Sequence, residues 1–256
     1  MKELKILDSQ TVFDLPRGEG NPRNSEGDFA VLKNGKILFA YSRYTGSSED
    51  DDAPCSIGAL ISSDNGRSFE KLPFFIAEAR EHSTLNIMSV SFCRLECGTL
   101  CLFYLCKYGA QSEYVMRRCV DEDRLIFDKA ETVIPKSDGV YYVVNNCRVL
   151  KLSDGSLIVP AAMHNIIKGA DNSDDNDYFA RSRVYKGDAD AKNWNAFSPV
   201  IEMPMPGYSQ TGLQEPGVIE LPDKRLYAYF RTSHAHDGQP AGASLERLSD
   251  YGFGSV

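Results

Sequence analysis

A short turn between two apolar runs recurs four times along this 256-residue chain, at intervals of about 60 residues. The turns are centred on Asn34-Gly35, Cys97-Gly98, Asp154-Gly155 and Asp223-Lys224, and their final residues are 63, 57 and 69 positions apart. Apolar residues alternate on both sides of each turn, which is the pattern of a β-hairpin. A repeat of this length predicts four-stranded sheets arranged as the blades of a β-propeller.

The remaining sequence favours the same all-β class. Pro and Gly interrupt the chain throughout, and no window sustains an apolar period of 3.6 residues beyond about three turns. We predict a single propeller domain over residues 1–256, with an atypical C-terminal tail at 233–256. The tail has no alternating apolar strand and keeps only a partial turn motif at Ser249, Asp250 and Gly252.

A turn motif follows the first hairpin. Ser62, Asp64, Gly66 and Phe69 form the pattern Ser-x-Asp-x-Gly-x-x-Phe. A short polar side chain, an aspartate and a glycine build a turn with its own hydrogen bonds, and the aromatic ring folds back onto the sheet. This pattern is the Asp box of β-propellers, and we assign it a structural role away from the catalytic face. Weaker matches lie around Asp121 and around Asp188, the latter followed by the single tryptophan, Trp194.

Charge and hydropathy exclude several classes of function. The net charge is −8, and no run of Lys or Arg forms a nucleic-acid footprint or a polybasic membrane anchor. The first ten residues lack the apolar core of a signal peptide, and no stretch approaches the ~20 apolar residues of a membrane span. We therefore expect a soluble, cytoplasmic protein with no nucleic-acid or membrane partner.

The chain contains seven cysteines, an odd number without the spacing of a disulfide framework or a zinc site. They are interpreted as small hydrophobic residues in a reducing compartment, with a metal or redox site as the alternative. No metal or other cofactor is expected.

Polar residues cluster at the hairpin ends that lie away from the turns. Strand direction alternates in an antiparallel sheet, so these ends share one face if all four turns share the other. The residues concerned are Arg23, Glu26, Arg43, Asn86, Lys107, Asn145, Asn146, His164, Glu215 and Arg231. Two acidic loops, Thr45 to Pro54 and Lys168 to Asp177, emerge on the same face. Propellers place their ligand sites where blades meet around the axis.

Each of these features also has a purely structural interpretation. Glu215 and Arg231 alone form an exposed salt bridge that closes a hairpin and contributes less than about 1 kcal/mol. The acidic loops alone are solvated connections, and His164 alone is a structural histidine.

The Asp box SSDNGRSF and the hairpins NNCRVLKLSDGSLIVP and QEPGVIELPDKRLYAYFRT together resemble the sialidase-like superfamily (neuraminidases, BNR repeat). The resemblance runs from about residue 21 to 232. It implies a six-bladed propeller and a retaining glycoside hydrolase of exo-α-sialidase type, which removes a terminal acidic sugar with a tyrosine nucleophile.

The resemblance also implies roles for individual residues. Glu215 occupies the position of the glutamate that polarises the tyrosine, and Arg231 follows it as a member of the arginine triad that binds the substrate carboxylate. Arg23 corresponds to another triad arginine, although the usual Arg-Ile-Pro is here Arg23-Asn24-Ser25. Asp52 and Asp51 match the acid/base aspartate. Further substrate contacts are expected from Arg43, Asn145, Asn146 and His164.

At about 60 residues per blade, the chain holds four of the family's six blades. The third arginine and the tyrosine would lie in the later blades, so none of the thirteen tyrosines inherits the nucleophile role. We expect a truncated propeller whose open edges favour self-association. Two alternatives to the hydrolase stay open: a non-catalytic glycan-binding module, and another glycan-active enzyme such as a polysaccharide lyase.

Overall fold

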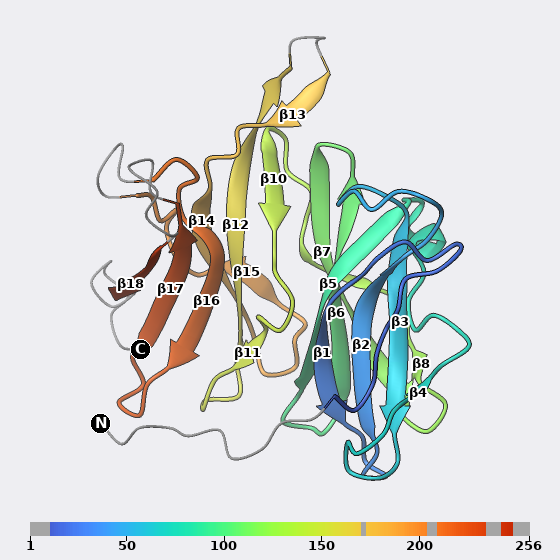
Figure 1. Cartoon of the computed structure of the whole chain (residues 1–256). Helices are drawn as coiled ribbons and strands as arrows, with labels where there is room; N and C mark the ends of the chain where they lie inside the picture. The colour runs from blue at the N-terminus through green and yellow to red at the C-terminus, as the bar shows by residue number, and fades with distance from the viewer. Residues whose placement is uncertain (1–10, 170–172, 204–208, 234–241, 248–256) are drawn as a thin grey trace.

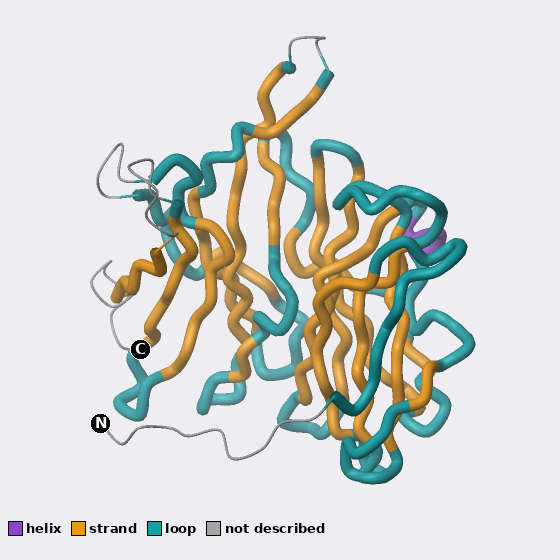
Figure 2. Tube along the Cα trace, in the orientation of Figure 1, coloured by secondary structure: helices purple, strands orange, loops and turns teal. Residues whose placement is uncertain are grey.

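The structure is a computed structural model that describes residues 11–169, 173–203, 209–233 and 242–247. Its strands form four antiparallel units that lie side by side in chain order (Figures 1 and 2). The one helical segment among the described residues is a 3₁₀ turn, η1 (Ala79–His82). No helix in this part of the chain is long and apolar enough to cross a membrane. The all-β prediction is confirmed.

The first two units have the strand order expected of four-stranded repeats. Unit one contains β1 (Asn24–Val31), β2 (Ile37–Tyr44), β3 (Cys55–Ser62) and β4 (Glu70–Lys71). Unit two contains β5 (Asn86–Arg94), β6 (Leu100–Tyr108), β7 (Gln111–Asp121), β8 (Ile126–Phe127) and β9 (Glu131–Ile134). A single parallel bridge, Cys55 to Asn86, joins the two units into one nine-stranded sheet.

The third and fourth units are less regular. Unit three contains β10 (Val140–Val143), β11 (Leu150–Lys151), β12 (Leu157–Lys168), β13 (Asp174–Asn176), β14 (Arg181–Gly187) and β15 (Trp194–Ala196). Unit four contains β16 (Gln214–Glu220), β17 (Leu226–Thr232) and β18 (Gly242–Arg247). β13 pairs with the end of β12, so the second acidic loop is part of a projecting hairpin (Figure 1).

Two sequence expectations about strands were wrong. The C-terminal tail contains a strand after all, because β18 pairs antiparallel with β17 over its whole length. An edge strand is held by backbone hydrogen bonds, which do not require the apolar alternation that the prediction relied on. The partial motif at Ser249, Asp250 and Gly252 lies outside the described residues.

The third hairpin also differs from its expected form. Its first strand is divided into β10 and β11, which pair with opposite ends of β12. Residues 144–149 between them are not in a strand, and Cys147 has a positive φ of 54°. A left-handed residue interrupts the extended backbone, which explains why the apolar pattern there did not produce one continuous strand.

All four hairpin turns have the same backbone geometry. In each, a leucine N–H donates to the carbonyl oxygen four residues later, at 2.8 to 2.9 Å, and the fourth residue of the turn has a positive φ. The four leucines are Leu32, Leu95, Leu152 and Leu221. These are three-residue hairpin loops with a left-handed third residue. The identical geometry supports the predicted internal repeat.

Three of the four turns have glycine at this left-handed position, and the fourth has Lys224, with φ of 70°. A side chain at positive φ costs roughly 1 to 2 kcal/mol, so we expect Lys224→Gly to stabilise the protein by about 1 kcal/mol. Urea denaturation measures the change. Lys224→Ala is the control, because it removes the hydrogen bond from Nζ to Ser153 Oγ but keeps the left-handed strain. The explanation fails if both variants change stability equally.

The core lies between successive units. One cluster joins unit one to unit two, a second joins unit two to unit three, and a third joins unit three to unit four. The first strand of each unit, or in unit three the segment between β10 and β11, is also hydrogen-bonded to its neighbour. Phe92 N–H donates to Asp28 Oδ2 at 2.7 Å, Cys147 N–H to the Val90 carbonyl at 3.0 Å, and Arg148 Nε to the Pro216 carbonyl at 3.1 Å. The first strands therefore form the inner side of the arc, as in a propeller.

The turn at Ser62 to Phe69 has the hydrogen bonds expected of the motif. Ser62 Oγ donates to Asp64 Oδ1 at 2.8 Å, Gly66 N–H donates to Ser62 Oγ at 2.9 Å, and the Phe69 ring packs edge-on against Phe29. Ser62 pairs with Ile37, so this turn lies on the same side as the hairpin turns. Asp121 and Asp188 accept backbone N–H groups in the corresponding turns of units two and three.

Hydrogen bonds from Ser68 and Ser62 lower the pKa of Asp64 to about 2 from its usual value of 3.8. A carboxyl group with a lowered pKa stabilises the fold above its unfolded pKa, and this contribution is lost as the pH falls through the folded value. Asp64→Asn should therefore be less stable than the wild type at neutral pH, with a gap that narrows between about pH 4 and pH 2. Urea denaturation at fixed pH measures the gap. A gap independent of pH over this range would contradict the explanation.

Candidate ligand-binding face

The strand register places five of the predicted polar residues along the edge opposite the hairpin turns. Four cross-strand pairs lie at this edge: Asn24 with Arg43, Asn86 with Lys107, Tyr141 with His164, and Gln214 with Arg231. In Figure 1 this is the upper edge, from which the β12–β13 hairpin projects. All four units therefore contribute polar side chains to one edge, which we call the ligand face.

The acidic loop, Thr45 to Pro54, folds onto the ligand face between units one and two. Arg23 Nη1 lies 2.5 Å from Asp51 Oδ1, and Lys107 Nζ lies 2.5 Å from Asp52 Oδ1. The structure thus brings together Arg23, Asp51 and Asp52, as the sequence predicted. Lys107 is 9% exposed, an unusual environment for a lysine, and its charge is matched by Asp52.

Arg23 is oriented by an aromatic ring as well as by the acidic loop. Its guanidinium carbon lies 4.7 Å from the centre of the Tyr44 ring, and its Nη1 also donates to the Glu49 carbonyl at 3.0 Å. Stacking on an aromatic face is a common way of fixing an arginine. Burial raises the pKa of Tyr44, so the ring is a neutral support for the cation.

Arg43 does not join this group. It alternates with Tyr44 along β2 and therefore lies on the opposite face of the sheet. Its guanidinium carbon lies 5.2 Å from the centre of the Phe75 ring. The structure places Arg43 on the outer side of unit one, away from Arg23.

Glu215 and Arg231 form an ion pair at the start of unit four. Arg231 Nε lies 3.0 Å from Glu215 Oε1, and both side chains are nearly half exposed. Glu215 has a positive φ of 48° and lies in a bulge between Gln214 and Gly217. A bulge re-aims a side chain, and a strained non-glycine backbone is enriched at functional sites.

The bulge recurs in the first strands of units one and two. Register shifts also occur between Ser25 and Gly27 and between Met88 and Ser91. Glu26, Ser89 and Asn146 all stand, like Glu215, six residues before the leucine of their hairpin turn. The position of Glu215 is therefore a repeated structural feature, and its carboxylate is what distinguishes unit four from units two and three.

His164 is buried at the ligand face, with 5% of its surface exposed. Its Nδ1 lies 3.9 Å from Asp177 Oδ1, and burial lowers its pKa although Asp177 opposes this. Nδ1 has no hydrogen-bond partner among the described residues. His164 is therefore a neutral side chain with one unused ring nitrogen.

Asn145 and Asn146 follow β10 on the inner side of the arc. Asn146 Nδ2 donates to the Gly27 carbonyl at 3.3 Å, a contact that joins units three and one. Asn145 Oδ1 is buried and has no hydrogen-bond partner within the described ranges. Asn146 thus has a structural contact, whereas the Asn145 oxygen is unused.

Sequence reasoning missed Tyr141. This side chain is 9% exposed and pairs across the sheet with His164. Burial raises its pKa, and the nearby charges of Asp52 and Asp51 raise it further. Tyr141 is therefore a neutral, buried side chain on the strand next to His164. Its position next to His164 is known only from the register of β10 and β12, because the run VYYVV has no feature that distinguishes Tyr141 from Tyr142.

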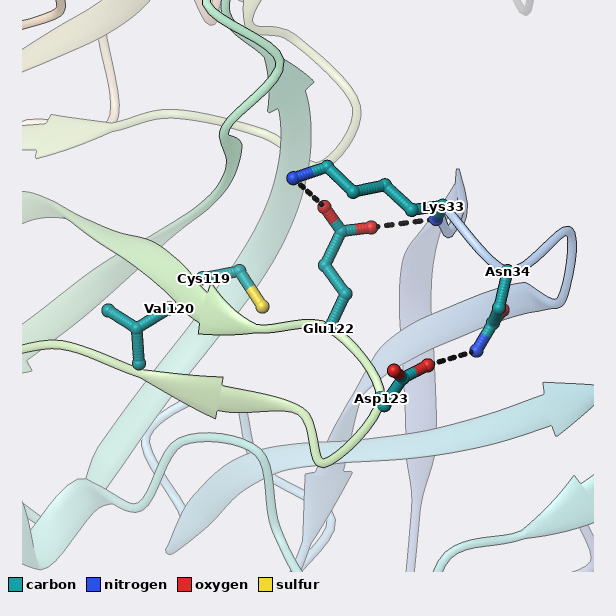
Figure 3. Close-up of a pocket in the computed structure, with 6 residues that line it drawn as sticks. All are labelled: Lys33, Asn34, Cys119, Val120, Glu122 and Asp123. Atoms are coloured by element: carbon teal, nitrogen blue, oxygen red, sulfur yellow. Dashed lines mark hydrogen bonds and ion pairs between the residues drawn. The ribbon is translucent and has the colours of Figure 1, made fainter.

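A pocket of polar residues lies on the opposite edge, between the hairpin turn of unit one and the β7–β8 turn of unit two (Figure 3). Its polar groups are paired with one another: Lys33 with Glu122, and Asn34 Nδ2 with Asp123 Oδ1 at 2.7 Å. These contacts join two units and leave no evident ligand group.

The described residues contain no cluster of three or more His, Cys, Asp or Glu side chains that could hold a metal ion. Cys97 and Cys147 are exposed, which corrects the expectation that the cysteines are buried hydrophobes. Cys97 lies in a hairpin turn and Cys147 in the break between β10 and β11, so neither belongs to an apolar strand face. The other five cysteines are buried, and all seven are free.

No family model matches the chain, and no curated protein matches it. Solved structures do match. A Hadza microbial sialidase superimposes with a TM-score of 0.65 at 13% identity, over 89% of this chain and 45% of its own. Trypanosoma rangeli sialidase, solved in complex with sialic acid, gives 0.57 at 12% identity, over 92% and 37%.

The similarity extends beyond sialidases. Penicillium chrysogenum α-L-arabinanase, complexed with arabinobiose, gives a TM-score of 0.53 at 17% identity, over 92% of this chain and 65% of its own. The chain spans less than two thirds of each of these three proteins. It has the β-propeller fold of the sialidases and related glycoside hydrolases.

Proposed function

We propose that this chain forms the ligand face of a sialidase-type glycoside hydrolase acting on a terminal acidic sugar. The observation that carries the proposal is the position of Arg23, the acidic loop and the Glu215–Arg231 pair on one edge of a sialidase-like fold. Two arginines provide donors for a carboxylate, and three carboxylates provide groups for acid/base chemistry.

In this proposal Arg23 and Arg231 bind the carboxylate of the sugar. Asp52 or Asp51 transfers the proton to or from the glycosidic oxygen, and Glu215 polarises the nucleophile. The neutral Tyr141 and His164 line the face between the acidic loop and unit four and offer hydrogen bonds to sugar hydroxyls. The partner implied is a glycan with a terminal acidic residue.

One observation favours a non-catalytic glycan-binding module instead. Asp51 and Asp52 are both engaged by cations, Arg23 and Lys107. A general acid must reach the glycosidic oxygen, whereas both of these carboxylates make ion pairs within the protein. The second candidate function is therefore recognition of an acidic glycan without hydrolysis.

A panel of fluorogenic glycosides separates these functions. The panel contains 4-methylumbelliferyl N-acetylneuraminic acid and the corresponding arabinofuranoside and xyloside, and binding of free N-acetylneuraminic acid is measured by calorimetry. Release from the sialoside that is abolished in Asp52→Asn or Asp51→Asn supports the hydrolase. Binding without release favours the recognition module. Release from a neutral pentoside alone contradicts the acidic-sugar assignment, and an unsaturated product from a uronate polymer indicates a lyase.

A further inference from the structure

The backbone of the acidic loop around Asp52 is hydrogen-bonded to unit two. Lys107 Nζ contacts Asp52 Oδ1 and also donates to the Asp51 carbonyl at 2.9 Å. Asn86 Nδ2 donates to the Asp51 carbonyl at 2.9 Å and to the Ala53 carbonyl at 2.6 Å. Asn86 and Lys107 are cross-strand neighbours, and both are buried. This side of the loop is therefore fixed to the sheet of unit two.

The Asp51 carbonyl belongs to this anchor, but the Asp51 side chain does not. The Asp51 side chain is 69% exposed and makes its ion pair with Arg23, which is 30% exposed. An ion pair this accessible to water contributes little, about 0 to 1 kcal/mol. The Asp52 side chain is also exposed, at 84%, but its partner Lys107 is only 9% exposed, so loss of Asp52 would leave a buried cation without its counter-charge. The Arg23 guanidinium itself is kept in place by Tyr44 and by the Glu49 carbonyl. Arg23 can therefore change its carboxylate partner without moving.

The electrostatics of the loop require such a partner when no ligand is bound. Four consecutive carboxylates, Glu49 to Asp52, face an edge that is proposed to receive an anion. Arg17 pairs with Glu49 and Lys107 with Asp52, while Asp50 Oδ2 accepts a hydrogen bond from Ser48 Oγ. Asp51 is thus the loop carboxylate that occupies Arg23.

We propose that Asp51 is an internal counter-ion for Arg23, which the carboxylate of an acidic sugar displaces on binding, while Asp52 stays anchored to Lys107. The inference rests on the proposed function and deepens it, because it gives different roles to two aspartates that the sequence leaves equivalent. Asp51 regulates access to the cation. Asp52 is the fixed carboxylate of the loop.

The test compares Asp51→Asn with Asp50→Asn. Both variants remove one negative charge from the same loop, but only the first removes the partner of Arg23. We expect Asp51→Asn to bind N-acetylneuraminic acid at least about fivefold more tightly than Asp50→Asn, measured by calorimetry at constant salt. The methyl ester of the sugar lacks the carboxylate charge and should bind both variants equally. Equal affinity of the two variants for the acid overturns the inference.

A second readout needs no ligand. Phenylglyoxal modifies accessible arginines, and peptide mass mapping follows the rate at Arg23. Asp51→Asn should raise this rate relative to Asp50→Asn, and an unchanged rate overturns the internal counter-ion whatever the sugar. If the rate rises but no variant binds the acidic sugar, the proposed function is wrong. The proposal that a sugar carboxylate displaces Asp51 is then wrong as well.

Discussion

Arg231→Ala is expected to weaken binding of N-acetylneuraminic acid by about tenfold to one hundredfold. Hydrogen bonds to a charged group contribute roughly 1.5 to 3 kcal/mol, which corresponds to this range. Arg231 is held at the ligand face by its ion pair with Glu215, so its donors are available at a defined position. Calorimetric titration of the acid and of its methyl ester measures the effect, and the ester should lose much less affinity.

Arg225→Ala is the matched control. Arg225 precedes the same strand, β17, at the turn end, where it pairs with Asp223. Its removal changes the net charge equally but leaves the ligand face intact, so affinity for the acid should change little. Equal losses for the acid and the ester in Arg231→Ala would contradict the carboxylate-binding role.

The second large effect is expected at Gly212, where units three and four meet. Its φ is +67°, and a Cβ added there would lie 2.1 Å from the Ala180 carbonyl oxygen. Backbone hydrogen bonds fix this contact: Ala180 N–H donates to the Thr211 carbonyl at 2.9 Å, and Leu213 N–H to the Ala180 carbonyl at 2.8 Å. Gly212→Ala should therefore lower the free energy of unfolding by more than about 3 kcal/mol.

Gly109→Ala isolates the contribution of backbone conformation. Gly109 has a similar φ of +65°, but no atom lies within 4 Å of its added Cβ. This substitution should cost about 1 kcal/mol, the ordinary cost of a left-handed residue. Urea denaturation compares the two variants. Similar losses would show that the close approach to Ala180 is not what makes Gly212 necessary.

The repeat was the most predictable part of the fold. Glycine at three of four turn positions and alternation on both sides located every hairpin, because these signals act locally. The sequence did not predict the interruption of the strand after Val143, because nothing in it indicates that Cys147 has a positive φ. β18 was missed because an edge strand depends on the neighbouring β17 and not on its own pattern.

The ligand face was predictable in part. The ends of the hairpins gave Arg23, Glu215 and Arg231, since antiparallel pairing alone determines which ends share an edge. The prediction could not tell that Arg43 lies on the outer face, because that depends on the strand phase set by Tyr44. The contacts of Lys107 with the acidic loop join unit two to unit one, and such contacts have no local signal.

The four identical turns have a consequence for how the molecule can be monitored. Each turn closes with a loop of only three residues, so every hairpin can form early and at small entropic cost. The proposed function makes the ligand face different, because Arg23 in unit one and Arg231 in unit four can bind one carboxylate only after all four units have docked. Spectroscopic strand content will therefore report hairpin formation, whereas carboxylate binding will report completed assembly.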